Sequence, residues 1–231
     1  MSQQREFDIS GLKVYIAIPC YTGSLPVETA LELSTLRLML KQYGVELIIH
    51  AERGNGVITE VRNKLITGFY ESDCDYLFWL DDDIIFESKD FVKVLALCTE
   101  KQVVGATYPS RRDPPVFYIH PLNRESKEFE FDELGLIKAK GIGLGFTCVN
   151  RAVVADLLKD KDTYKEPTGT RQFYNVFRNG VAKGEYWGED INFFYDLYDL
   201  GYITYVDPDV FLKHVGRKDY DTKFKVKQGE H

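Results

Sequence analysis

A chain of 231 residues is long enough to bury one sizeable hydrophobic core, and this length favours one domain, or at most two small ones. Its hydrophobic content of 44% is ordinary for a soluble globular protein, and its net charge of −7 argues against a general nucleic-acid-binding protein, which needs a basic face. The polar start has no apolar signal region and no apolar run approaches membrane-spanning length, so we expect a cytosolic protein without a membrane span.

The four cysteines are far apart in the sequence, lie among apolar residues and form no Cys-x-x-Cys pair. This pattern argues against a zinc site or a disulfide framework. We therefore expect buried, reduced thiols at Cys20, Cys74, Cys98 and Cys148.

Strand and helix patterns alternate along residues 1–108. Aliphatic residues alternate with Tyr15 and Ala17 over 13–19, where Pro19 ends a strand by removing a backbone donor. The following segments are a helix at 27–43, a strand at 45–50, a loop at 51–56, a helix at 57–70, an apolar strand from residue 76, a helix at 90–97 and a strand at 102–108. This order predicts parallel pairing with right-handed crossovers, and therefore a three-layer α/β/α sandwich with a mixed, mostly parallel central sheet.

Three consecutive carboxylates follow the apolar strand. Residues 76–80 are apolar or aromatic, Asp81, Asp82 and Asp83 come next, and an apolar run resumes at once. Adjacent aspartates repel one another and lose hydration if they follow a buried strand inward. A solvated turn or helix cap is the simpler explanation, but perturbed charge beside a buried element favours a functional site. We expect magnesium or manganese here, shared with a phosphate outside the carboxyl ends of the strands.

The pattern changes after residue 109. A surface loop at 110–115 holds Arg111 and Arg112, and weak alternation over 117–141 predicts antiparallel strands around turns. The following segments are a helix at 151–158 that Asn150 could cap, a long polar connection at 159–184, a helix that opens at 186–190 and ends at Gly201, a strand at 202–206, a short extended piece at 210–214 and a polar tail at 217–231.

Glycines alternate at positions 141, 143 and 145, which is not the Gly-x-Gly-x-x-Gly spacing of a dinucleotide-binding fingerprint. The first strand is also not followed by a Walker-type loop, so a Rossmann dehydrogenase and a P-loop nucleotidase are both disfavoured. Alternating glycines fit either a close approach of the backbone to a ligand or bulges in a strand.

Glu189 and Asp190 stand where the last long helix begins, directly after Tyr186, Trp187 and Gly188. Carboxylates at this position could simply complement the helix dipole, which is worth roughly 0.3–1 kcal/mol. The neighbouring aromatic residues favour a functional role, because a carboxylate beside an apolar wall can hold the raised pKa that a general base needs.

Together these residues resemble the GT-A type of nucleotide-sugar glycosyltransferase. The resemblance covers most of the chain and rests on a strand ending at Pro19, a helix start with Arg62 and Asn63, a DxD-type motif at Asp81 to Asp83, a Gly-x-Gly-Phe segment at 143–146, Trp-Gly-Glu-Asp at 187–190, and His214 near the end. It implies transfer of a sugar from a nucleotide-diphosphate sugar to a hydroxyl of a saccharide or glycoconjugate. The third aspartate departs from the pattern and leaves the choice of ligands open.

The resemblance also implies a role for each matching residue. Asp83 would be the principal Mn²⁺ or Mg²⁺ ligand, Asp81 a ribose or second metal contact, and Asp82 could exchange roles with either. His214 would complete the metal shell, although a lone histidine is more often a packed or surface residue. The nucleotide would be contacted by Pro19, Tyr21, Thr22, Arg62, Asp81 and Asp82, and the acceptor sugar by Gly143, Gly145, Phe146, Tyr186 and Trp187.

Catalysis and partners follow from the same resemblance. In inverting members the acidic residue of the Glu-Asp pair takes the proton of the acceptor hydroxyl, and here Asp190 is preferred to Glu189. The donor is expected to be a UDP-sugar, because UDP is the common nucleotide of this group, and the acceptor a saccharide. Residues 1–108 would form a nucleotide-binding half and 109–216 an acceptor-binding half of one domain. The sequence gives no indication of the oligomeric state.

Three other functions compete with this interpretation. A non-catalytic protein that binds sugar nucleotides or carbohydrates would not need both the acidic triplet and Glu189-Asp190. A sugar nucleotidyltransferase should carry a Gly-rich, basic loop after the first strand, where residues 20–25 contain only Gly23. A metal-dependent phosphatase or nuclease fits the triplet alone.

Overall fold

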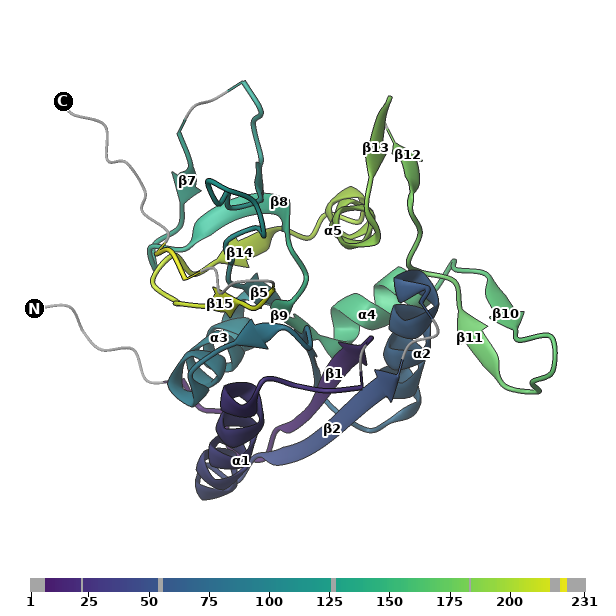
Figure 1. Cartoon of the computed structure of the whole chain (residues 1–231), viewed down its shortest axis with the longest axis horizontal. Coiled ribbons are helices and arrows are strands. Elements are labelled where there is room, and N and C mark those ends of the chain that lie inside the picture. Colours follow the sequence, from purple (N-terminus) through teal and green to yellow (C-terminus); the bar gives the residue numbers. More distant parts are fainter. Residues whose placement is uncertain are drawn as a thin grey trace, which may run out of the picture.

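A mixed β-sheet of nine strands runs through the part of the chain that the structure describes (Figure 1). The structure is a computed structural model, and it describes residues 7–21, 23–53, 56–125, 128–182, 184–216 and 221–223. In spatial order the sheet contains β2 (Glu46–Arg53), β1 (Lys13–Cys20), β3 (Tyr76–Leu80), β9 (Phe146–Asn150), β5 (Val103–Gly105), β14 (Thr204–Val206), β8 (Ile137–Ile142) and β6 (Ile119–Pro121), with β7 (Glu130–Phe131) also paired to β8.

Most strands of this sheet run in one direction. β1 pairs in parallel with both β2 and β3, and β14 pairs in parallel with β5. β9 runs antiparallel between β3 and β5, and β8 runs antiparallel to β14 and β6. The carboxyl ends of β1, β2, β3, β5 and β14 therefore meet at one edge of the sheet, as the sequence predicts for a mixed, mostly parallel sheet.

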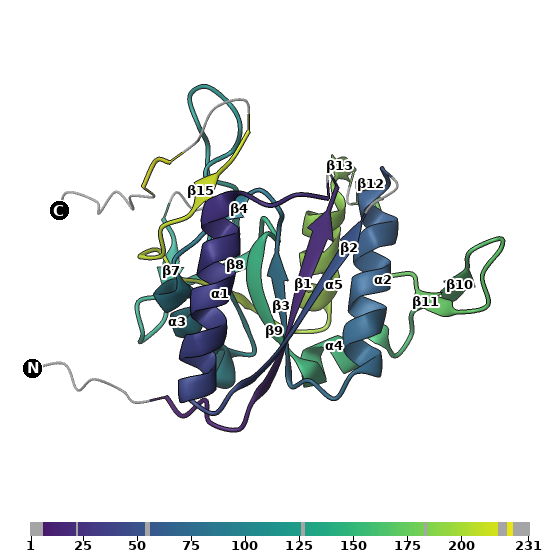
Figure 2. The ribbon, with the colours of Figure 1, turned by 60° about the horizontal axis from the view of Figure 1, so that its bottom comes forward.

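Helices cover both faces of the sheet and complete the three predicted layers (Figure 2). One face is covered by α1 (Val27–Gln42) and α3 (Ser88–Lys101), and the other by α2 (Ile58–Glu71), α4 (Arg151–Leu158) and α5 (Glu189–Asp199). Three two-stranded ribbons lie outside the sheet: β10 (Thr163–Lys165) with β11 (Gln172–Tyr174), β12 (Gly180–Ala182) with β13 (Glu185–Trp187), and β15 (Lys213–His214) with β4 (Ile84–Ile85).

The central strand β3 supplies both hydrophobic cores because its side chains alternate between the two faces of the sheet. Phe78 and Leu80 belong to the core beneath α1 and α3, whereas Leu77 and Trp79 belong to the core beneath α2, α4 and α5. All five residues of this strand are buried, which explains why the sequence shows an uninterrupted apolar run instead of a polar alternation.

The predicted elements of the first half are confirmed with small shifts of their ends, and α4 begins as expected, with the Asn150 side chain accepting a hydrogen bond from the backbone N–H of Ala152 (2.8 Å). The predicted antiparallel strands of 117–141 are confirmed as β6, β7 and β8. Two expectations were wrong: the connection at 159–184 contains three short strands, and the helix expected to open at 186–190 begins only at Glu189, because Tyr186 and Trp187 pair in the β12–β13 ribbon. Strand β9, at residues 146–150, was not predicted.

All four cysteines are free and buried, as predicted from their spacing. Among the described residues, no helix combines the length and the apolar character that crossing a membrane requires.

Phe78 is the residue whose loss should weaken the fold most clearly. Its ring stacks on Phe91 with 3.8 Å between the ring centroids and meets the edge of Phe146 at 4.9 Å. We predict that Phe78→Ala lowers the free energy of unfolding by about 3–5 kcal/mol, because it leaves a cavity in a packed core. Urea denaturation measures this loss. The control Leu38→Ala removes an exposed side chain of α1 and should change stability by no more than about 0.5 kcal/mol; similar losses in the two variants would contradict the packing.

Candidate functional site

Asp81 leaves β3 on the side of α2 and meets a buried arginine. The guanidinium of Arg62, which is only 4% exposed, donates from Nη2 to both oxygens of Asp81 (2.9 and 3.2 Å), and its Nε lies 3.3 Å from Oε1 of Glu189. The same guanidinium lies over the ring of Trp79, 5.4 Å from its centroid. One buried cation thus joins the exit of the central strand to the first turn of α5.

The charges of this cluster do not cancel completely. Burial raises the pKa of Asp81 to about 6, against the lowering effect of Arg62, and the carboxylates of Asp83 and Glu189 add to the rise. Burial by itself lowers the pKa of Arg62, but Asp81 and Glu189 outweigh it and raise that pKa. The arrangement therefore favours further positive charge near Asp81, as expected for a site that accepts a cation.

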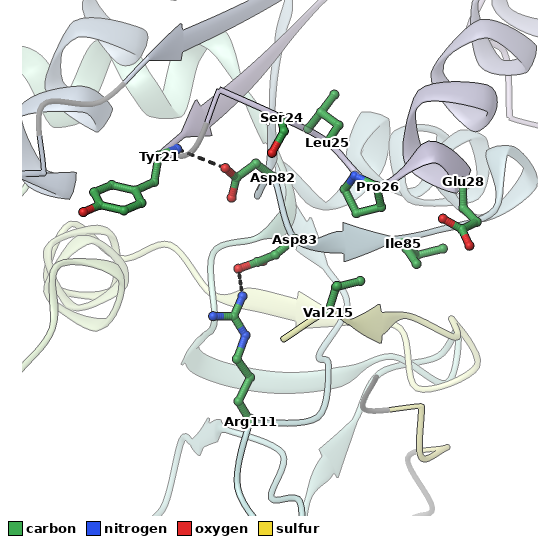
Figure 3. A pocket seen from close by; sticks show the side chains of 10 residues that line it. All are labelled: Tyr21, Ser24, Leu25, Pro26, Glu28, Asp82, Asp83, Ile85, Arg111 and Val215. Atoms are coloured by element: carbon green, nitrogen blue, oxygen red, sulfur yellow. Dashed lines mark hydrogen bonds and ion pairs between the residues drawn. The ribbon is translucent and has the colours of Figure 1, made fainter. Parts of the chain in front are cut away.

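Asp82 points to the opposite side, toward the loop after β1. Its Oδ2 accepts a hydrogen bond from the backbone N–H of Tyr21 (3.0 Å). Both residues line a cavity of about 660 Å³, here called the Asp82 cavity, which also contains Asp83 and Arg111 (Figure 3). The wall of this cavity is completed by Ser24, Leu25, Pro26, Glu28, Ile85 and Val215.

Asp83 lies beside His214 because β15 pairs antiparallel with β4 and aligns His214 with Ile84. His214 Nε2 is 3.5 Å from Asp83 Oδ1, and His214 Nδ1 is 2.9 Å from the carbonyl oxygen of Pro109. A carbonyl can only accept, so Nδ1 carries a proton, and Nε2 is the ring nitrogen that faces the carboxylate. The other carboxylate oxygen of Asp83 accepts from the guanidinium of Arg111.

The Asp83–His214 pair fits a divalent cation. Nε2 and a carboxylate oxygen of Asp83 face each other as two possible ligands, and a carbonyl that holds the other ring nitrogen is a usual partner of a metal-bound histidine. Within the described ranges, no cluster of three or more His, Cys, Asp or Glu side chains is arranged to hold a metal. Two protein ligands nevertheless suit magnesium or manganese where substrate phosphates supply the other oxygens.

A second cavity of about 420 Å³, here called the Trp187 cavity, adjoins His214. His214 lines this cavity, while Asp83 lines the Asp82 cavity. Its wall is largely aromatic and consists of Thr107, Tyr108, Arg112, Tyr118, His120, Gly143, Trp187, Asp190, Ile191 and His214.

Asp190 brings a carboxylate with a raised pKa into the Trp187 cavity. Burial is the main cause of that rise, the charge of Glu189 adds to it, and Arg62 opposes it. Oδ1 of Asp190 accepts from the backbone N–H of Ile191 (2.7 Å), in the first turn of α5. Glu189 points instead to Arg62, so the two adjacent carboxylates have different surroundings.

The alternating glycines make room for side chains of the site itself. A Cβ on Gly143 would lie 2.7 Å from the Tyr108 hydroxyl, and one on Gly145 would lie 2.7 Å from Asp81 Oδ2. The Tyr108 hydroxyl also accepts a hydrogen bond from the backbone N–H of Gly145 (3.2 Å). These glycines thus allow close packing around Asp81, and Gly143 also lines the Trp187 cavity.

A third cavity, here called the Pro19 cavity, lies between the end of β1 and the start of α2. It measures about 190 Å³ and is lined by Pro19, Cys20, Tyr21, Gly56, Val57, Ile58 and Val61. Pro19 and Tyr21 were both predicted to contact a nucleotide. Thr22, predicted with them, lies outside the described residues.

Two of the residues that were predicted to contact the acceptor sugar do not line the Trp187 cavity. Phe146 is fully buried and packs against Phe78, Phe86 and Phe91, so its ring has no surface to offer a sugar; the prediction that it lines the acceptor is not supported by its position in the core. Tyr186 is 71% exposed on β13 and does not line the Trp187 cavity.

Several residues of the site were not singled out from the sequence. Tyr108 lies between Asp81 and Asp190, and burial together with these two carboxylates raises its pKa well above the usual value. His120 packs against Trp187, and burial, followed by the charge of Arg124, lowers its pKa. Tyr108 stands at the carboxyl end of a predicted strand, which could have indicated it, whereas His120 had no such signal.

Comparisons with known proteins concern the fold. No protein-family model matches the sequence, and no curated protein matches it. The chain is similar to the crystal structure of A197 from STIV, with 22% identity and a TM-score of 0.54 over 95% of this chain and 98% of that chain. A crystal structure of GalNAc-T7 with UDP, GalNAc and Mn²⁺ is matched at 12% identity and a TM-score of 0.47, over 90% of this chain and 44% of that chain. The predicted fold class, a three-layer α/β/α sandwich with a mixed, mostly parallel central sheet, is confirmed.

The raised pKa of Asp81 predicts a dependence of stability on pH. Its folded-state pKa of about 6 exceeds the ordinary value of 3.8, so the folded protein binds this proton more tightly than the unfolded chain. The resulting stabilisation is present at low pH and is lost as the pH rises through 6. We predict that the free energy of unfolding of the wild type, relative to Asp81→Asn, increases by about 2 kcal/mol from pH 7 to pH 4.

Urea denaturation of both proteins across this pH range measures the difference. Asp73→Asn is a suitable control, because an exposed ion pair with Lys13 lowers the pKa of Asp73. Its contribution falls only below its ordinary pKa and should not increase between pH 7 and pH 4. A flat difference for Asp81 would contradict the pKa assignment.

Proposed function

We propose that this chain is a metal-dependent glycosyltransferase that moves a sugar from a nucleotide-diphosphate sugar to a hydroxyl of a saccharide or glycoconjugate. One observation carries the proposal: of the neighbouring residues Asp83 and His214, Asp83 lines one cavity and His214 lines another, which also holds Asp190 with a raised pKa. A cation site between a space for a donor and a space with a base is the arrangement that such a transfer needs.

The proposed donor site is formed mainly by residues 1–108. The Pro19 cavity is the candidate for the base, since Pro19 and Tyr21 lie at the carboxyl end of β1, where open α/β sheets bind ligands. Asp82 stands between this loop and Asp83, so a diphosphate would lie beside the three aspartates. UDP is the default nucleotide only because the resemblance makes it the common one.

Asp83 and His214 are the proposed ligands of Mn²⁺ or Mg²⁺. Asp81, which the resemblance also allows as a ligand, is engaged by Arg62, so we assign it and Arg62 to holding the site in place. A bound dication would offset the negative charge that develops on a departing diphosphate. Arg62 keeps Asp81 in position and ties it to Glu189, and thus to the helix that carries Asp190.

The proposed acceptor site is the Trp187 cavity, formed mainly by residues 107–214. The aromatic side chains of Trp187, Tyr118 and His120 offer rigid surfaces of the kind on which a sugar ring packs. Asp190 would accept the proton of the attacking hydroxyl, and its raised pKa makes it a better base near neutral pH than an ordinary aspartate.

Metal dependence is the first test of this proposal. We predict that UDP binds only in the presence of Mn²⁺, and that Asp83→Asn and His214→Ala each weaken this binding by more than about tenfold. Loss of a residue that only hydrogen-bonds to a metal ligand already lowers metal affinity by about tenfold or more, so loss of a ligand itself should cost at least as much. Calorimetric titration of UDP with and without Mn²⁺ measures both effects. His120→Ala removes another partly buried histidine and should leave UDP binding unchanged. Equal UDP affinity with and without Mn²⁺ would contradict the proposal.

The role of Asp190 is a separate prediction. Asp190→Asn should bind UDP and Mn²⁺ like the wild type but release UDP from UDP-sugars about 10²–10⁴-fold more slowly, because it lacks a general base. Steady-state turnover of a panel of UDP-sugars with Mn²⁺ measures this. Asp199→Asn, at the exposed opposite end of α5, is the matched control and should turn over normally. Normal turnover by Asp190→Asn would exclude it as the base.

The same assay, extended to UTP with sugar phosphates and to simple phosphate esters, separates the competing functions. A non-catalytic binding protein would bind UDP-sugars without releasing UDP, and a sugar nucleotidyltransferase would form pyrophosphate from UTP and a sugar phosphate. A phosphatase or nuclease would hydrolyse simple phosphate esters.

A further inference from the structure

The loop from Ser110 to Val116 stands between the Asp82 cavity and the Trp187 cavity. Its base is closed by hydrogen bonds from Ser110 N to Val116 O (2.8 Å) and from Val116 N to Ser110 Oγ (3.0 Å). Arg111 lines the first of these cavities, and Arg112 lines the second. The loop therefore brings one arginine to the cavity that Asp83 lines and the next arginine to the cavity that His214 lines.

Arg111 pairs with the carboxylate that is the proposed principal metal ligand. Its guanidinium contacts Oδ2 of Asp83 (Figure 3). The other oxygen of the same carboxylate, Oδ1, faces His214. A guanidinium and a dication on one carboxylate repel each other and compete for the same negative charge. The ion pair and a fully bound cation are therefore mutually unfavourable.

Breaking the ion pair between Arg111 and Asp83 requires little free energy. The Arg111 side chain is 45% exposed and that of Asp83 is 29% exposed, and ion pairs with this much solvent access are weak. The Asp82 cavity also offers the guanidinium an open space next to the aspartates. A guanidinium matches phosphate oxygens with two parallel hydrogen bonds, so a diphosphate in this cavity is a suitable second partner.

We propose that Arg111 is a binding residue for the diphosphate of the donor and that, in the free protein, it occupies Asp83 in place of the metal. Cation binding at Asp83 and His214 then releases Arg111, which turns to the diphosphate. This inference rests on the proposed function, and it adds an ordered exchange of partners. The guanidinium of Arg111 leaves the carboxylate of Asp83 when the metal ion binds there, and it then binds the diphosphate of the donor.

The proposal predicts opposite effects of one substitution on two ligands. Arg111→Ala should bind Mn²⁺ alone about two- to fivefold more tightly than the wild type, because the competing weak ion pair is gone. With saturating Mn²⁺, the same variant should bind UDP roughly tenfold more weakly, because it has lost a charge-assisted contact with the diphosphate. Electron paramagnetic resonance of free Mn²⁺ and calorimetry with UDP measure the two affinities.

Two further variants sharpen the test. Arg111→Lys keeps the charge but not the paired donors, so its Mn²⁺ affinity should stay near that of the wild type while UDP binding is reduced. Arg112→Ala removes the neighbouring arginine, which lines the other cavity, and should leave the Mn²⁺ affinity unchanged.

The outcomes distinguish this proposal from the proposed function. If the wild type binds Mn²⁺ and UDP together but Arg111→Ala changes both affinities in the same direction, or neither, the exchange by Arg111 is overturned and the metal site stands. If the wild type binds no Mn²⁺, or binds UDP equally well without it, the metal site itself is overturned and the exchange with it.

Discussion

The contact on which the rest of the site depends is the buried ion pair of Arg62 with Asp81, extended to Glu189. It lets a strand that is buried on both faces end in carboxylates without exposing the core, because the positive charge is supplied from the adjacent helix α2. It also fixes α5 against the exit of β3. Removing one partner of a buried pair leaves an uncompensated charge, which is far more costly than the pair is stabilising. The position of Asp190 is therefore tied to the same pair through its neighbour.

The sequence predicted the fold correctly where hydrophobic patterns extend over many residues. The apolar run before Asp81 and the alternation of strands and helices over residues 1–108 led directly to β1, β2, β3 and the helices around them, because periodicity over eight or more residues is a strong signal. Strand β9 was missed because its five residues, of which only Phe146, Cys148 and Val149 are apolar, lie between a glycine segment and a helix and are too few to show a period of their own. Only its pairing with both β3 and β5 makes it a strand.

The sequence identified several residues of the candidate site, but it did not indicate which of them contact one another. The order of strands and helices suggested that the acidic triplet lies outside the carboxyl ends of the strands, and only the family resemblance joined His214 and Asp190 to it. The sequence could not indicate that Arg62 faces Asp81 and not open space, nor that Arg111 reaches Asp83, because both contacts join segments whose separation is set by tertiary packing. For Phe146 the motif was misleading. The Gly-x-Gly-Phe segment resembles a binding segment, but the ring of Phe146 is buried in the core.

The alternation of β3 has a consequence for how this chain can tolerate change. Leu77 and Trp79 face one layer and Phe78 and Leu80 the other, and the same parity carries Asp81 to Arg62 and Asp82 to Tyr21. Insertion or deletion of a single residue in this strand would exchange the two aspartates as well as the two layers. A one-residue change in length is thus forbidden here for a chemical reason in addition to a packing reason. A two-residue change would keep each side chain on its face of the sheet and would only shift the carboxylates along the strand direction.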